Sequence, residues 1–170
     1  LQKAFARGDG VRPVRLTTRA GGLYRFSAPE VQLLTGEKVF ELIGTAEQRA
    51  KLEKEGGVVL AGKIRFEQES RKCVLVDGVE VRLYSGDKIT SRPDLLIQAA
   101  RADVEFEAAD KEQEAEGGLL RDLRSIKVLN ASSGEKTPLT VSGKIFEMRG
   151  EKATWSSSAR QLRFYGNGLQ

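Results

Sequence analysis

Histidine is absent from the 170 residues of this chain and cysteine occurs once, and these two scarcities exclude most kinds of catalytic site. Without histidine there is no Ser-His or Cys-His nucleophile pair, and most zinc and iron sites lose a usual ligand. The single Cys73 cannot form an intrachain disulfide, and its position in an apolar alternation indicates a small buried side chain. No phosphate-binding loop of the Gly-x-x-x-x-Gly-Lys-Ser/Thr type occurs either. We therefore expect a protein that is not an enzyme and that holds no metal and no cofactor.

Long hydrophobic runs are also missing. The longest, residues 57–61, is far shorter than the roughly 20 residues that cross a bilayer. The chain begins at Leu1 without a charged segment followed by an apolar one, so we expect that any targeting segment has been removed or lies outside this chain. A content of 39% hydrophobic and 31% charged residues is typical of a folded domain.

The net charge of +4 is confined to the N-terminus, because residues 1–20 carry five basic side chains against Asp9 alone. We interpret residues 1–22 as a basic arm, either a solvated tail or a contact for anionic headgroups or phosphates. Residues 23–170 form the expected folded domain. Nucleic-acid binding is not expected, because the charge is local and aromatic residues are few.

One pattern occurs four times in the folded domain. Each copy has an apolar anchor, another apolar residue two positions earlier, a basic residue five positions later and a glycine eleven or twelve positions later. Positions seven and nine after the anchor are apolar in three of the copies. The anchors are Leu33, Phe66, Phe106 and Trp155, and the closing glycines are Gly44, Gly78, Gly117 and Gly166.

These spacings are two alternations of period two, separated by a short polar bend, and they predict repeated antiparallel hairpins with one apolar face. The fold class is therefore all-β. The third copy has Gln113 and Ala115 at its core positions, so we expect the sheet to open there. The apolar face comprises Val31, Leu33, Phe40, Leu42, Ile64, Phe66, Cys73, Leu75, Val104, Phe106, Ala153, Trp155, Leu162 and Phe164.

Two segments depart from the pattern. Residues 45–48, with the sequence Thr-Ala-Glu-Gln, have the form of a capping box, which predicts a short polar helix in a charged insertion near 45–57. Pro93 and Asp94 predict a bend or an edge position, after which Leu95 and Ile97 resume an alternating strand.

Residues 151–168 and 63–81 resemble the repeat unit of the OstA-like family, the periplasmic lipopolysaccharide-transport proteins. The resemblance is carried by an alternating strand, a basic residue beside the bend, a second alternation and a closing Gly or Gly-Asn, as in Ala153, Trp155, Arg160, Leu162, Phe164, Gly166 and Asn167. It implies an open, twisted β-jellyroll of V-shaped section, a "β-taco", whose apolar groove holds lipid A acyl chains. The implied lipid-binding residues are Ile64, Phe66, Leu75, Val104, Phe106, Trp155, Leu162 and Phe164.

The resemblance also implies partners and a location. The partners are lipopolysaccharide and other β-jellyroll transport proteins, or further copies of the chain, joined by edge-strand pairing in the periplasm. Two groups within the family fit this sequence. One is a free bridging component, and the other is tethered to the inner membrane by a segment outside this chain. The alternative is a structural or assembly β-repeat protein with a closed core and no lipid ligand.

Overall fold

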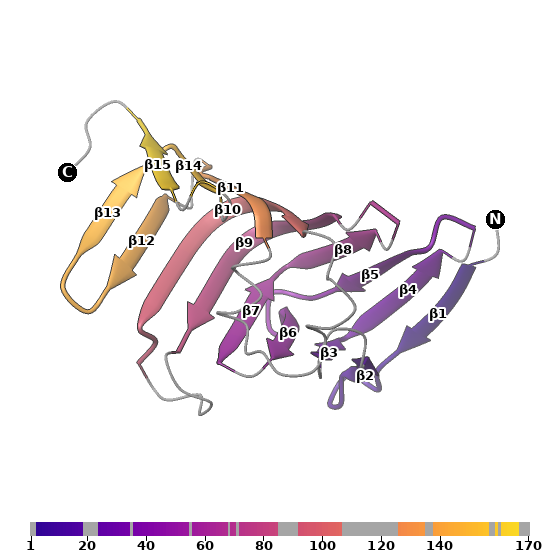
Figure 1. The fold of residues 1–170 in the computed structure, drawn as a ribbon. Coiled ribbons are helices and arrows are strands. Elements are labelled where there is room, and N and C mark those ends of the chain that lie inside the picture. The colour runs from indigo at the N-terminus through magenta and orange to yellow at the C-terminus, as the bar shows by residue number, and fades with distance from the viewer. Residues whose placement is uncertain are drawn as a thin grey trace.

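The structure is a computed structural model, and it describes residues 3–18, 24–34, 36–54, 56–67, 69–70, 72–84, 92–106, 126–134, 138–156, 159 and 161–166. In these ranges the chain forms strands and connecting turns and contains no helix. The strands make one 15-stranded antiparallel sheet that does not close on itself (Figure 1). The expected all-β class is confirmed.

The sheet has two branches that share their two longest strands. The main branch runs in the order β1 (Lys3–Arg7), β4 (Glu30–Leu34), β5 (Val39–Ile43), β8 (Lys63–Glu67), β9 (Lys72–Leu83), β10 (Leu95–Phe106), β11 (Ile126–Ser132), β14 (Lys152–Ser156) and β15 (Gln161–Tyr165). The side branch runs in the order β2 (Val14–Thr18), β3 (Tyr24–Ala28), β6 (Ala50–Lys54), β7 (Gly57–Ala61), β9, β10, β12 (Leu139–Gly143) and β13 (Glu147–Gly150).

The branches meet along a line of chain corners, which we call the crease. Strand β9 turns there at Asp77 and Gly78, which have φ of +64° and +76°; it pairs with β8 before this point and with β7 after it. Neighbouring corners are tied by main-chain bonds from Gly44 N to Gly62 O (2.7 Å) and from Gly62 N to Asp77 O (3.0 Å). Each corner therefore redirects the chain from one branch into the other.

Cross-strand pairing aligns the apolar residues of the main branch in two rows. The outer row joins Leu33, Phe40, Phe66, Cys73, Val104, Leu129, Trp155 and Leu162. The row beside the crease joins Val31, Leu42, Ile64, Leu75, Ala102, Ala131, Ala153 and Phe164. Such alignment is expected when one face of every strand must be apolar, because a one-residue slip would reverse the faces.

The side branch has a matching row. It joins Leu16, Phe26, Leu52, Val59, Val81, Ile97, Val141 and Met148. Buried side chains from both branches form one apolar cluster, with alanines near the crease at Ala28, Ala50, Ala61, Ala99, Ala102, Ala131 and Ala153. Small side chains fit there because the two branches diverge from the crease.

The predicted helix in the 45–57 insertion is wrong. Thr45 Oγ1 accepts a hydrogen bond from Gln48 N (3.0 Å), as a capping box requires, but Thr45 N also donates to Gln48 O (2.8 Å). This reciprocal pair closes a tight bend, and strands β6 and β7 follow it.

The N-terminal arm is not a tail over residues 3–18. Strand β1 pairs with β4 and strand β2 pairs with β3, so this basic segment forms the end of the sheet. Residues 1–2 and 19–22 lie outside the described part of the chain.

Three predicted hairpins are confirmed as β4–β5, β8–β9 and β14–β15. In the third copy the partner of β10 is β11, while Gln113 and Ala115 lie outside the described residues. The expected opening depends on those two residues and stays a prediction; at β10 itself, Val104 pairs with Cys73 and Leu129 and continues the row. The bend at Pro93 and Asp94 is confirmed where β9 connects to β10, with Asp94 N donating to Leu83 O.

Candidate functional site

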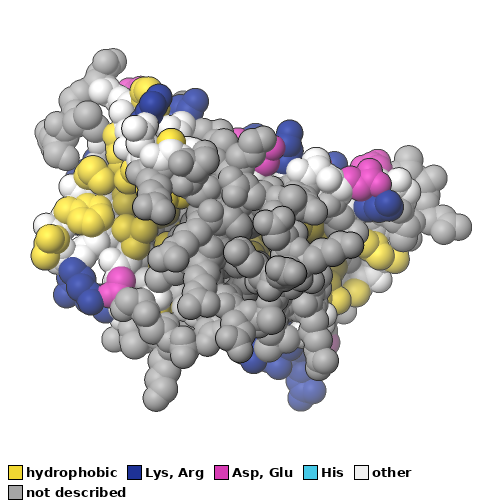
Figure 2. All heavy atoms as spheres, in the orientation of Figure 1, with side chains coloured by type: hydrophobic (Ala, Val, Ile, Leu, Met, Phe, Trp, Pro, Cys, Tyr) yellow, Lys and Arg dark blue, Asp and Glu magenta, His cyan; other side chains and the backbone are white. Residues whose placement is uncertain are grey.

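The apolar inner face is closed in the middle of the sheet and uncovered at both ends. In the middle, Ile64 and Leu75 are 1% and 2% exposed. At the ends, Leu16, Leu33 and Leu162 are each 41% exposed. Figure 2 shows hydrophobic side chains gathered at the end where β12 and β13 lie. The apolar rows therefore reach the surface where the sheet ends.

An aromatic cluster links the branches near the N-terminal end. The Phe26 ring, from β3, meets the Phe40 ring of β5 edge-on, with centroids 5.3 Å apart and planes at 82°. Phe40 in turn packs against Phe66 of β8, with centroids 4.9 Å apart. All three side chains are half-buried, so they offer apolar surface at the boundary of the closed core.

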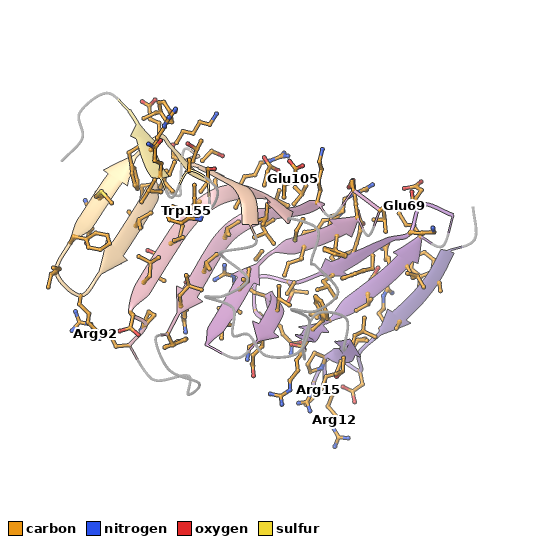
Figure 3. The ribbon with its side chains drawn as sticks, in the orientation of Figure 1. Arg12, Arg15, Glu69, Arg92, Glu105 and Trp155 are labelled. Atoms are coloured by element: carbon orange, nitrogen blue, oxygen red, sulfur yellow. The ribbon has the colours of Figure 1, made fainter. Side chains whose placement is uncertain are left out.

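Trp155 takes the corresponding place near the C-terminal end. It stands on β14 in the outer row, between Leu129 and the exposed Leu162, and its ring packs against the core (Figure 3). The indole Nε1 is buried and meets no hydrogen-bond acceptor in the described structure. This end of the inner face thus combines apolar surface with one free polar hydrogen.

The eight predicted lipid-binding residues divide into three groups. Ile64, Leu75 and Val104 are buried in the closed core, and Phe66, Trp155, Phe164 and Leu162 are half-buried or exposed on the same face. Phe106 pairs with Ile126 at the end of β10, and its side chain lies outside the described part.

The predicted site does not include the side branch. Leu16, Phe26, Val141 and Met148 face the same interior from strands that the repeat pattern did not include. Alternation of Val79, Val81 and Leu83 was the available signal, because it showed that β9 continues past its glycine.

The outer face of the sheet is polar and charged. Glu41, 7% exposed, is a buried charged residue of this face, and its carboxylate contacts Lys63 Nζ at 2.9 Å and Arg65 Nη1 at 3.1 Å. The two partly exposed cations neutralise the buried carboxylate. Glu41 therefore stabilises the sheet and is not free to bind a ligand.

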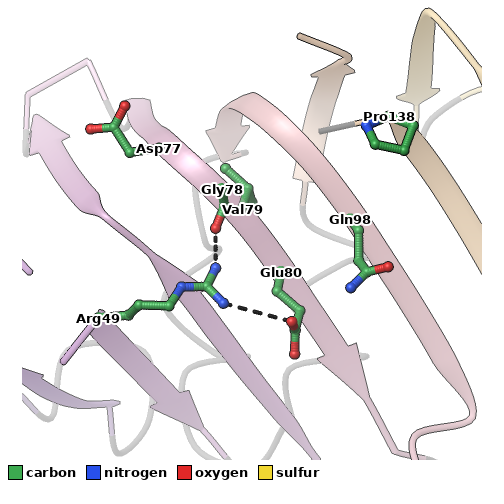
Figure 4. Close-up of a pocket in the computed structure, with 7 residues that line it drawn as sticks. All are labelled: Arg49, Asp77, Gly78, Val79, Glu80, Gln98 and Pro138. Carbon is green, nitrogen blue, oxygen red and sulfur yellow. Dashed lines mark hydrogen bonds and ion pairs between the residues drawn. The ribbon is translucent and has the colours of Figure 1, made fainter. Parts of the chain in front are cut away.

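A cavity of about 300 Å³ opens on the outer side of the crease (Figure 4). Its lining includes Arg49, Asp77, Glu80 and Gln98. Arg49 donates to the carbonyl oxygens of Leu60 and Gly78 and lies 3.6 Å from the Glu80 carboxylate. Its guanidinium therefore fastens the corner before β6 to strands β7 and β9, and the cavity is polar where the inner face is apolar.

Burial raises the pKa of the Cys73 thiol to about 12, so it stays protonated and unreactive at neutral pH. The described ranges contain no cluster of three side chains able to ligate a metal ion. Over the same ranges, the structure has no helix with the length and apolarity needed to span a bilayer.

Comparison with protein-family models and with curated proteins finds no match to this sequence.

Proposed function

We propose that this chain is a lipid-binding transport module of the OstA-like kind, which holds acyl chains against the apolar inner face of its folded sheet. The observation that carries the proposal is the continuity of the apolar rows, which run through the main branch from β4 to β15 and include the exposed Leu33 and Leu162 at their two ends. A sheet face that is apolar to its last strand suits an elongated apolar ligand or a further sheet.

The finer fold belongs to the same proposal. Two branches that share β9 and β10, diverge from a crease and contact each other through Phe26 and Phe40 support an open jellyroll of V-shaped section. Because alanines occupy the inner face near the crease, the space for a ligand lies farther out, along the outer row. This is where Phe66 and Trp155 stand.

Loading requires the branches to separate, because the middle of the inner face is closed. An acyl chain that buries about ten methylenes gains about 8 kcal/mol. This gain offsets the free energy lost when inner-face side chains separate, because the acyl chain makes new apolar contacts with the same side chains. The ends, where Leu16, Leu33 and Leu162 are already exposed, are the proposed entry points.

The partners follow from the two ends of the sheet. Strands β1 and β2 end the two branches on one side, and β15 and β13 end them on the other (Figure 1). Their outer edges have no strand partner among the described residues, and such edges add strands from other chains. We propose head-to-tail pairing with similar modules or further copies in the periplasm, with lipopolysaccharide as the cargo.

A matched pair of variants tests the proposal. Leu162 and Arg163 are neighbours on β15 that point to the inner and outer face, and both are exposed, so Leu162→Glu and Arg163→Glu should both fold. Binding of purified lipopolysaccharide should fall at least tenfold for Leu162→Glu, because the new carboxylate must be desolvated, and change little for Arg163→Glu. Equal affinity of the two variants would contradict the proposal.

The second candidate is a structural β-repeat protein whose core stays closed. The near-complete burial of Ile64, Leu75 and Leu42 favours it. In that case purified protein binds no lipopolysaccharide, and the Leu162→Glu substitution alters only association between sheet ends.

A further inference from the structure

The buried indole N–H of Trp155 is a polar group in an apolar place. Its ring packs against the core of the sheet, and Nε1 has no hydrogen-bond acceptor in the described structure. A buried donor left without a partner costs about 1–3 kcal/mol. A phenylalanine would fill much of this space without that cost, so the N–H calls for an explanation.

The described neighbours of Trp155 in the two rows offer no side-chain partner to a structural water. A buried water needs two to four polar partners. The inner-face neighbours of Trp155 in the two rows are apolar: Ala131, Ala153, Leu162 and Phe164. A bound molecule that is itself largely apolar can bring the acceptor that these described neighbours lack.

The position of Trp155 indicates which part of such a molecule it meets. Strand β14 is next to the edge strand β15, where Leu162 is exposed, so the ring lies just inside the uncovered end of the inner face. A lipid that enters there places its chain along the rows and leaves its polar end outside. The first oxygen on the chain then lies near the mouth, within the zone that Trp155 occupies.

We infer that Trp155 Nε1 donates a hydrogen bond to an oxygen carried by the acyl chain itself, either an ester carbonyl or a chain hydroxyl. The inference rests on the proposed lipid-binding function and adds a specificity to it. Trp155 selects oxygen-bearing acyl chains over plain alkyl chains, whereas the rest of the inner face contributes apolar contact that does not distinguish them.

Three lysophosphatidylcholines of equal chain length test this, joined to their chain by an ester, by an ether, and by an ether with a hydroxyl on the chain. Calorimetry on the purified chain should show at least one oxygen-bearing probe binding about five- to tenfold more tightly than the plain ether. The oxygen-bearing probe that binds more tightly identifies the acceptor as a carbonyl or a hydroxyl oxygen. Trp155→Phe should abolish the preference, so that the three probes bind this variant with equal affinity, whatever its affinity for the plain ether.

Phe40→Leu is the matched control, because Phe40 stands in the same row near the other end and has no polar atom. This substitution should lower the affinity for all three probes by the same factor. The inference would be overturned if the wild type showed no preference for an oxygen-bearing probe, or if Trp155→Phe kept that preference. Binding of the probes would in either case still support the proposed function. Absence of binding by all three probes would overturn the proposed function and the inference with it.

Discussion

Substitution of Gly44 by alanine tests the crease, on which the two-branched arrangement of the sheet depends. A Cβ added at Gly44 would lie 2.6 Å from Ala50 N, 2.9 Å from Arg49 Cα and 3.0 Å from Arg49 C. All three are main-chain atoms, so no side-chain rotation relieves the contact. The bend that contains Arg49 must therefore move. This movement weakens the hydrogen bonds from Arg49 to Leu60 O and from Gly44 N to Gly62 O.

The expected cost follows from these contacts. Overpacking costs about 1–3 kcal/mol and a weakened main-chain hydrogen bond about 1 kcal/mol. We therefore expect Gly44→Ala to lower the free energy of unfolding by about 2 kcal/mol or more. For a chain of this length, that change lowers the melting temperature by about 4–8 °C.

Gly36→Ala is the matched control in the same assay. Gly36 lies in the exposed turn between β4 and β5, and a Cβ there has no atom within 4 Å. Its φ is outside the left-handed region, so alanine should stabilise the protein by about 0.4–1 kcal/mol through the unfolded chain. Urea denaturation of the two variants should shift the midpoint in opposite directions. A Gly44→Ala variant as stable as Gly36→Ala would refute the packing described for the crease.

Two further predictions concern titratable groups. Because burial raises the pKa of Cys73 to about 12, a thiol reagent at neutral pH should label the folded protein far more slowly than the urea-unfolded protein, and equal rates would show that β9 is not packed as described. The Glu53 carboxylate accepts a hydrogen bond from Lys51 and lies 3.5 Å from Arg25, and these contacts lower its pKa from the ordinary value of 4.5. A lowered folded pKa adds stability that is complete above 4.5 and is lost as the pH falls through the folded value. The difference in unfolding free energy between wild type and Glu53→Gln, measured by urea denaturation across pH, should therefore be constant above about pH 5.5 and shrink in acid. A difference that grows on acidification would contradict this assignment.

The main branch could be predicted from the sequence because its hairpins share one spacing. The anchors Leu33, Phe66 and Trp155 fall in a single row of the sheet, as period-two alternation requires. The side branch could not be found in the same way. Leu52 is the large apolar residue of β6 and is flanked by the charged Lys51 and Glu53, so the strand looked like a solvated insertion.

The wrongly predicted helix has a local physical cause. A hydroxyl bond from position 45 to the amide at position 48 begins many helices, but in this chain the same bond closes a bend because Thr45 N is also bound to Gln48 O. The third copy was aligned by counting residues from Phe106. The described strand that pairs with β10 on this side is β11, which begins at Ile126, whereas a fixed spacing places the second strand at Gln113 and Ala115, outside the described residues.

The candidate site was predicted in part. Trp155, Leu162, Phe164 and Phe66 were placed on the inner face by alternation, and the structure has them there. The free N–H of Trp155 could not be predicted, because it depends on which side chains surround the indole in three dimensions. The contribution of Phe26 depends likewise on the pairing of distant strands.

Photo-crosslinking at neighbouring positions on opposite faces of one strand tests the proposed function most directly. A photoreactive phenylalanine would replace Phe40, Phe66 or Leu162 on the inner face, and Glu41, Arg65 or Arg163 on the outer face. We predict lipopolysaccharide adducts at the inner positions and none at their outer neighbours, because only the inner face is apolar in every strand. Adducts at both faces alike, or at neither, would contradict the assignment of the folded sheet as a lipid carrier.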